Sequence, residues 1–197
     1  MARPRTYDTE QVLEGAIEVF RERGYEATRL PELVERLGIC RQSLYTTFGG
    51  KRGLYIQALE RWGRREIDAK LVLLNEASSA LEGVRTIIRG LADMATHCPG
   101  EGCLTARALV ELRDDPEALT LIEAQVARLE DGFAEALQRA ANAGELAPSA
   151  QPRRLARALI TGCYGVGLLA RLPSSGARIA DGVSVLLDVL DAAATKP

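Results

Sequence analysis

Two short helices joined by a glycine turn, within residues 30–55, constrain the fold of this chain more than any other feature. Apolar residues recur at helical spacing before Gly38, which predicts a first helix with one buried face. They are Leu30, Leu33, Val34 and Leu37. Gly38 follows directly, and glycine adopts the left-handed conformation that ends a helix at little cost. We therefore expect the first helix to end here and the chain to turn sharply.

The second helix of the pair is expected from Arg41 to Phe48. An inward stripe is predicted for its bulky residues, Leu44, Tyr45 and Phe48. The remaining positions face outward and are Arg41, Gln42, Ser43, Thr46 and Thr47. Two helices at a steep angle around a tight turn form a helix-turn-helix, whose second helix enters the DNA major groove. Because many helical hairpins share this pattern, the residues around it have to specify the fold.

The surrounding residues make the helix-turn-helix interpretation more specific. The chain from Asp8 to Leu59 resembles the DNA-binding domain of the TetR family of bacterial transcriptional regulators. The matching residues are Ala16, Phe20, Gly24-Tyr25, Thr28, Leu33, Gly38, Leu44-Tyr45, Phe48-Gly49, Lys51 and Leu54. The remainder matches the family only in length and helical character. The resemblance implies an all-α fold of about nine helices. It also implies a three-helix, helix-turn-helix DNA-binding domain at residues 1–55 and a helical ligand-binding and dimerisation domain at 56–197.

The motif departs from the family pattern at two places. Cys40 stands where the family usually has Ser or Thr before the recognition helix, and losing a good helix cap costs about 1 kcal/mol. Arg52 replaces the usual acidic residue after Lys51, so two cations open the next helix. The free N–H groups and positive dipole of a helix start favour an anion. We therefore expect Lys51 to anchor a DNA phosphate, with a purely structural role as the alternative.

Roles within the recognition helix follow from side-chain chemistry. Arg41 and Gln42 carry donor groups suited to guanine and adenine edges. Ser43, Thr46 and Thr47 are expected to donate to phosphate or to touch a thymine methyl. The resemblance implies that Tyr45 packs its ring inward and offers its hydroxyl to a phosphate.

Flanking residues extend this predicted DNA interface. Thr28 is expected to cap the helix that follows it, and Arg29 to reach a phosphate. The N-terminal arm is basic and proline-stiffened, and we expect Arg3 and Arg5 to lie in the minor groove. The alternative is a disordered tail that happens to be basic.

The charge distribution supports this division of the chain. Residues 1–65 contain twelve Lys or Arg against nine Asp or Glu, whereas residues 66–197 contain thirteen against eighteen. A DNA-binding part needs cations to displace counterions from phosphate. The excess is small and would indicate little without the motif.

Helical periodicity continues to the C-terminus. The last helix, at about residues 177–193, is apolar nearly all round from Val183 to Leu190, so we expect it to be covered on both sides. The resemblance implies that the last two helices form a four-helix dimer interface with a second copy, and we expect Leu186 and Leu187 to be buried there. The alternative is a central core helix in a monomer.

A ligand pocket is predicted only from bulky or polar residues on otherwise aliphatic helix faces. The candidates are Trp62, Met94, Cys103, Arg107, Glu111, Phe133 and Tyr164. An aromatic residue or methionine at helical spacing is more often plain core, and this alternative stays open for each of them.

Catalytic and metal chemistry find little support. The single histidine, His97, has no partner at triad-like spacing, and the chain lacks glycine-rich phosphate loops and paired catalytic carboxylates. We expect no catalytic residues, no metal site and no cofactor. A thiol or metal sensor that uses Cys98 and Cys103 is the alternative. A helix N-terminus would lower the pKa of the Cys103 thiol, whereas nearby Glu101 and apolar burial would raise it, and we expect no sensor role.

The sequence therefore predicts a ligand-responsive transcriptional regulator. We expect a repressor that binds a palindromic double-stranded DNA operator as a homodimer and is released by a small-molecule effector. A helical enzyme or carrier is the alternative. No stretch approaches the roughly 18 apolar residues of a membrane span and no signal peptide opens the chain, so we expect no membrane partner and a cytoplasmic location.

Overall fold

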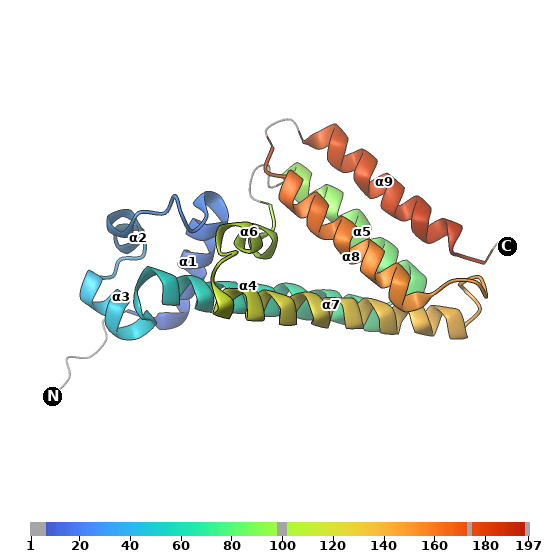
Figure 1. Ribbon diagram of the computed structural model, residues 1–197, viewed down its shortest axis with the longest axis horizontal. Coiled ribbons are helices and arrows are strands. Elements are labelled where there is room, and N and C mark those ends of the chain that lie inside the picture. The colour runs from blue at the N-terminus through green and yellow to red at the C-terminus, as the bar shows by residue number, and fades with distance from the viewer. Residues whose placement is uncertain (1–6, 98–101, 173–174, 196–197) are drawn as a thin grey trace.

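The computed structural model describes residues 7–97, 102–172 and 175–195, and within these ranges the chain folds into nine α-helices without β-strands. The all-α prediction is therefore confirmed. The helices are α1 (Thr9–Arg23), α2 (Leu30–Arg36), α3 (Arg41–Phe48), α4 (Gly50–Glu76), α5 (Ala80–His97), α6 (Leu104–Glu111), α7 (Pro116–Asn142), α8 (Pro152–Leu169) and α9 (Gly176–Ala192). Figure 1 shows α1–α3 at one end of an elongated molecule and α5, α8 and α9 at the other.

The N-terminal end contains the expected helix-turn-helix. Asp8 caps α1 by accepting the N–H of Glu10 at 2.9 Å. After α2, Gly38 has φ +62°, the left-handed conformation predicted for the turn. Aromatic packing fixes these helices on the start of α4, because the rings of Phe20 and Tyr55 meet edge to face at 4.7 Å.

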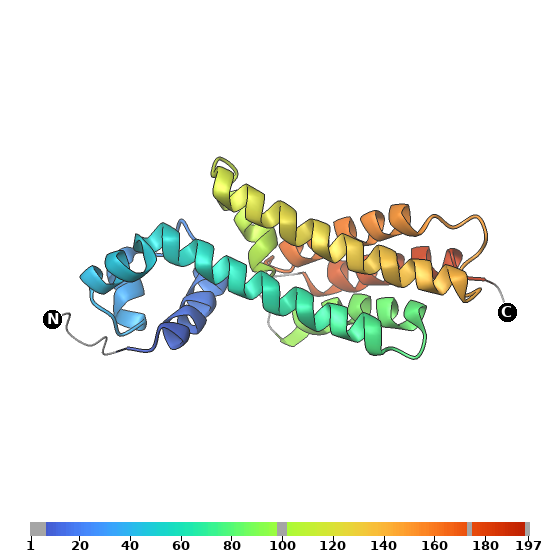
Figure 2. The same ribbon diagram turned by 90° about the horizontal axis from the view of Figure 1, so that it is seen from below.

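Two helices of 27 residues each, α4 and α7, lie side by side and run in the same direction through the molecule (Figure 2). Arg52 at the start of α4 pairs with Asp115 before α7, and Arg139 near the end of α7 donates to the carbonyl of Leu74 near the end of α4. Between them, the buried amide of Gln125 donates to the carbonyl of a residue on α4 at 3.1 Å. The pair therefore forms a continuous spine between the two ends.

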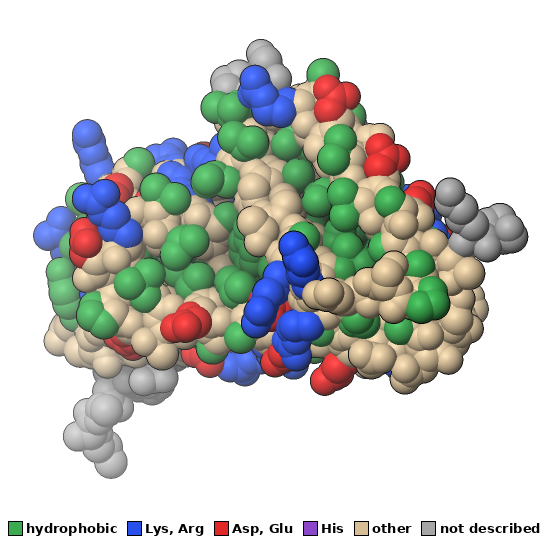
Figure 3. Space-filling model, turned by 45° about the vertical axis from the view of Figure 1, so that its right-hand side comes forward, with side chains coloured by type: hydrophobic (Ala, Val, Ile, Leu, Met, Phe, Trp, Pro, Cys, Tyr) green, Lys and Arg blue, Asp and Glu red, His purple; other side chains and the backbone are tan. Residues whose placement is uncertain are grey.

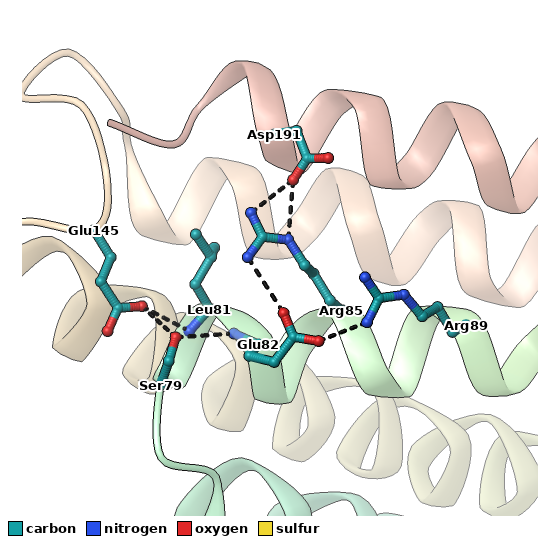
Figure 4. Close-up of polar contacts among 7 residues, drawn as sticks. All are labelled: Ser79, Leu81, Glu82, Arg85, Arg89, Glu145 and Asp191. Carbon is teal, nitrogen blue, oxygen red and sulfur yellow. Dashed lines mark hydrogen bonds and ion pairs between the residues drawn. The ribbon is translucent and has the colours of Figure 1, made fainter. Parts of the chain in front are cut away.

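At the far end, polar contacts join three segments that are distant in sequence (Figure 4). The carboxylate of Glu145 accepts the N–H of Leu81 and the hydroxyl of Ser79, so it caps the start of α5. The Ser79 hydroxyl also accepts an N–H from the first turn of α5. Arg85 on α5 binds Asp191 on α9 at 2.7 Å. These contacts hold the start of α5 on the α7–α8 connection and join α5 to α9.

The expected domain boundary at residue 55 falls inside α4 and stays a prediction. Buried residues of α6 and α7, among them Leu104 and Ile122, pack in the same apolar cluster as α1–α3. A second cluster lies among α4, α5, α7, α8 and α9. None of the described helices combines the length and apolarity that crossing a membrane requires.

Candidate functional site

The recognition helix α3 presents a polar, exposed surface. Arg41, Gln42 and Thr46 are exposed, whereas Leu44 and Phe48 are buried, as the periodicity predicts. Thr46 donates its hydroxyl to the Gln42 carbonyl at 2.9 Å. The two residues best suited to reading base edges therefore lie at the accessible start of the helix.

Tyr45 is placed differently from the prediction that its ring packs inward. Its side chain is 58% exposed, because position 45 lies about 100° around the helix from the buried Leu44. The ring covers the backbone of Gly50, where a Cβ would come within 2.9 Å of it. Tyr45 thus belongs to the surface, with its ring against the start of α4.

Two partly buried side chains flank the exposed row. Thr47 shares a hydrogen bond of 2.7 Å with the hydroxyl of Tyr7, which ties α3 to the residues before α1. Ser43 donates its N–H to the sulfur of Cys40 at 3.5 Å, so this cysteine occupies the N-cap position of α3. Hydrogen bonds from Ser43, first from its hydroxyl, lower the pKa of the exposed Cys40 thiol.

Lys51 lies in the first turn of α4, and that turn lacks a side-chain cap. Its ammonium is 4.3 Å from the centre of the Tyr25 ring, a cation–π contact. Partial burial lowers the pKa of Lys51, while Glu26 and Glu111 act in the opposite direction. The free N–H groups of the helix start and the ammonium together favour an anion.

Two other residues of the predicted DNA interface, Arg52 and Thr28, contact the protein itself. Arg52 points to α7, where its guanidinium binds Asp115 and Glu117. Thr28 is only 1% exposed, and its hydroxyl donates to the carbonyl of Gly24. The expectation that Thr28 caps α2 is therefore wrong, because the N-cap is the exposed Arg29, whose side chain makes no capping bond.

The predictions for Arg3 and Arg5 lie outside the described residues. The same holds for Cys98 and for the side chain of Met94, which is part of α5. Within the described ranges, no group of three His, Cys, Asp or Glu side chains is placed to hold a metal ion.

A small cavity of about 90 Å³ lies among α4, α5, α6, α7 and α8. Three of the sequence-predicted ligand residues line it, namely Trp62, Cys103 and Tyr164. Sequence reasoning missed the others, which include Glu66, Ile67, Lys70, Leu91, Leu129 and Cys163. Lys70 binds Glu66 at 3.1 Å, and such a pair four residues apart in sequence resembles any solvated helix surface.

Three candidates for this cavity belong elsewhere. Phe133 is fully buried in the apolar cluster and is not part of the cavity wall. Arg107 and Glu111 form an ion pair of 2.7 Å at the end of α6, beside the turn that follows α1. These two residues connect the C-terminal helices with the helix-turn-helix.

Burial controls the thiols on the cavity wall. It raises the pKa of the Cys103 thiol, and it raises the pKa of Cys163 to about 12. Both are therefore protonated near neutral pH, and a protonated thiol is a poor nucleophile.

Comparison with known proteins identifies the family of this chain. Residues 12–58 match the family model of bacterial regulatory proteins of the tetR family, and residues 80–185 match that of the tetracyclin repressor-like C-terminal domain. The chain belongs to the TetR family of bacterial transcriptional regulators. Its N-terminal helices are thus the DNA-binding helix-turn-helix of such a regulator.

Individual relatives agree with this membership. The uncharacterized HTH-type transcriptional regulator YezE of Bacillus subtilis is 36% identical over 194 residues, which cover 97% of this chain and 100% of YezE. The reduced form of Escherichia coli NemR shares the fold, with a TM-score of 0.83, 18% identity and coverage of 95% and 97% of the two chains. A cysteine mutant of the TetR-family regulator CifR, complexed with 26 bp operator DNA, gives a TM-score of 0.76 and 27% identity over 98% of this chain and 100% of CifR.

Proposed function

We propose that this TetR-family regulator is a repressor that binds a palindromic operator as a homodimer. A small molecule in the cavity releases it. The observation that carries the proposal is the exposed polar surface of α3, beside the uncapped start of α4 with Lys51. A relative of the same fold, CifR, has been solved with operator DNA. Family membership favours a regulator over the alternative of a helical enzyme or carrier.

The DNA contacts divide into base and phosphate contacts. Arg41 and Gln42 read base edges, because both are exposed, and the paired donors of the Arg41 guanidinium suit guanine while the donor and acceptor of the Gln42 amide suit adenine. Lys51 and the free N–H groups of α4 hold a phosphate, and the exposed Arg29 and Tyr45 hold others. Phosphate contacts set the register and base contacts set the sequence.

Dimerisation is supported by apolar side chains that the chain itself leaves exposed. Leu168 and Leu169 on α8 and Val185 and Val189 on α9 are examples, and Figure 3 shows hydrophobic side chains over this part of the surface. A second copy would cover them, and a two-fold axis would place two recognition helices about 34–36 Å apart. A two-fold dimer of this spacing requires a palindromic operator.

The cavity provides a site for the effector. Its aromatic and aliphatic wall, with the paired charges of Glu66 and Lys70, suits a mostly apolar ligand with a polar group. At about 90 Å³ it is smaller than the roughly 300–1,000 Å³ of drug-sized sites, so a larger effector has to widen it. Such widening would favour a second arrangement of the dimer and weaken DNA binding.

Helix α6 offers a route for this change. Cys103, the N-cap residue of α6, lines the cavity, and Glu111 at the other end of the helix contacts the turn after α1. We place the protein in the bacterial cytoplasm, because a regulator of this family works on chromosomal DNA.

The proposal is tested by selecting fragments of the source genome on immobilised protein and sequencing them. The account predicts enriched palindromic sites that overlap promoters, and reduced transcription from those promoters when the protein is added to RNA polymerase in vitro. Enrichment of no fragment would refute the DNA-binding assignment, and increased transcription would make the protein an activator.

A further inference from the structure

The last turn of α6 holds the backbone of the helix-turn-helix through two charged side chains. The Glu111 carboxylate accepts the N–H of Tyr25 at 2.6 Å and the Nε of Arg107 at 2.7 Å. The Nη2 of Arg107 donates to the carbonyl of Arg23, at the end of α1. Both side chains are largely buried. We call Arg107 and Glu111 together the α6 clasp.

The turn after α1 is shaped to receive this clasp. Gly24 has φ +84°, which side chains other than glycine rarely adopt. A Cβ at this position would collide with the guanidinium of Arg107. The clasp therefore occupies space that only a glycine leaves open, and it fixes both peptide groups that flank the glycine.

The Tyr25 side chain carries this constraint to the DNA-facing surface. Its ring meets the buried Tyr55 ring at 5.0 Å, edge to face, and the ammonium of Lys51 at 4.3 Å. The backbone of Tyr25 is held by Glu111, and its ring is in turn the platform for Lys51. One chain of contacts thus connects α6 with the first turn of α4.

We propose that Arg107 and Glu111, which lie outside the helix-turn-helix, are positioning residues that hold Lys51 ready for a DNA phosphate through Tyr25. The inference rests on the proposed phosphate contact of Lys51. A lysine loses much rotamer freedom when it is ordered. A fixed ring beneath the ammonium restricts that freedom before DNA arrives, so less of it is lost on binding.

Simple electrostatics predicts the opposite effect for the same carboxylate. An isolated negative charge near Lys51 repels DNA, so removing Glu111 would tighten binding. The carboxylate is, however, paired with Arg107 and hydrogen-bonded to Tyr25, which leaves little net charge to repel a phosphate. The sign of the effect therefore separates positioning from repulsion.

The experiment measures binding of the full chain to a labelled random-sequence duplex of about three helical turns, long enough for both half-sites. Such a probe suffices because phosphate contacts are independent of sequence. Affinity is measured across a series of KCl concentrations for wild type, Glu111→Gln, Lys51→Ala and the double variant. Glu111→Gln keeps the side-chain size and removes the ion pair.

We expect Lys51→Ala to reduce the slope of log K against log salt by about 0.9, the share of one phosphate contact. Glu111→Gln should weaken binding about tenfold and flatten the slope in the same direction. In the Lys51→Ala background, Glu111→Gln should have almost no further effect, because the contact that it positions is already lost.

Controls separate positioning from a loss of fold. Asp68→Asn removes a carboxylate from the α4–α7 ion pair with Arg128, and it should bind DNA like wild type. Loss of folded protein lowers the active fraction without changing the salt slope. If Glu111→Gln unfolds, the Arg107→Leu/Glu111→Leu variant removes both charges together and is measured in its place.

Three results would overturn the inference. They are wild-type or tighter binding by Glu111→Gln, an unchanged slope, and additive losses in the double variant. If Lys51→Ala itself leaves the slope unchanged, the phosphate contact under the proposed function is also wrong. If Lys51→Ala behaves as expected and Glu111→Gln does not, only the positioning role fails.

Discussion

Val185→Glu tests whether a second copy covers α9. The side chain of Val185 is 59% exposed in the single chain, the largest exposure of any valine or leucine on α8 and α9. Fully burying a valine contributes roughly 1.5–3 kcal/mol, so covering this fraction contributes about 1 kcal/mol in each protomer. An unpaired carboxylate in the same place would cost several kcal/mol more.

Both copies of a dimer carry the substitution. Taken together, the lost burial and the two unpaired carboxylates destabilise the dimer by roughly 6 kcal/mol or more, which raises its dissociation constant by a factor of roughly 20,000 or more. Because the site is exposed in the single chain, the fold of the monomer should be unaffected. Sedimentation velocity at micromolar concentration should show a dimer for wild type and a folded monomer for Val185→Glu.

The matched control is Val72→Glu. Val72 is also a half-exposed valine, but it lies on α4, away from the proposed interface. The Val72→Glu variant should stay dimeric and keep its DNA affinity, whereas Val185→Glu should lose tight binding to a palindromic site. A wild type that is monomeric, or a Val185→Glu variant that remains dimeric, would refute the reasoning.

Further predictions concern the recognition helix, the thiols and the ion pair of Arg52 with Asp115 at the start of α7. Gln42→Ala should relax base preference at one or two operator positions, measured by binding to a library of single-base operator variants, and unchanged preference would remove it from base reading. Alkylating Cys40 with iodoacetamide should block DNA binding in wild type but not in Cys40→Ser, because this exposed thiol lies at the start of the recognition helix. Mild peroxide should not release the operator, and Cys103→Ser should bind DNA like wild type, because burial keeps the pKa of the Cys103 thiol high. Release of the operator by peroxide from wild type but not from Cys103→Ser would make the protein a redox sensor. The hydrogen bond from Arg52 lowers the pKa of Asp115 to about 2 from 3.8. The ionised carboxylate therefore stabilises the fold fully above about pH 4, and this stabilisation is lost as the pH falls through about 2. Asp115→Asn should lower the urea midpoint of unfolding at pH 6 and have little effect near pH 2.

The sequence predicted the helix-turn-helix well, because its signals are local. The apolar spacing around Leu33 and the turn at Gly38 are both properties of adjacent residues, and the structure has both. Tyr45 was mispredicted because its hydrophobic ring was assigned to the core, whereas the structure leaves it on the surface over Gly50. An amphipathic side chain at the edge of an apolar stripe does not reveal its direction.

The α9 helix shows a second limit. Leu186 and Leu187 were expected in the dimer interface, yet both are partly buried against the core of their own chain, and the outward positions are Val185 and Val189. A stretch that is apolar nearly all round, as residues 183–190 are, carries little periodicity from which an outward face can be chosen.

The α6 clasp and the cavity depend on contacts between residues far apart in the sequence. Glu111 and Tyr25 are 86 residues apart, and in sequence Arg107 and Glu111 resemble an ordinary helix ion pair. Only the fold shows that the pair faces the turn after α1. Trp62 and Tyr164 do line the cavity, and the sequence could single them out because they are bulky aromatic residues on otherwise aliphatic helix faces; their contact with a ligand stays a prediction.

The most direct test of the central claim is a hydroxyl-radical footprint of the wild-type protein on a fragment selected from the source genome. The account predicts two protected half-sites related by a dyad, with centres about one helical turn apart or a multiple of it, occupied by two protomers. Protection of a single half-site by one protomer, or the absence of any localised protection, would contradict the claim that this protein reads a palindrome as a dimer.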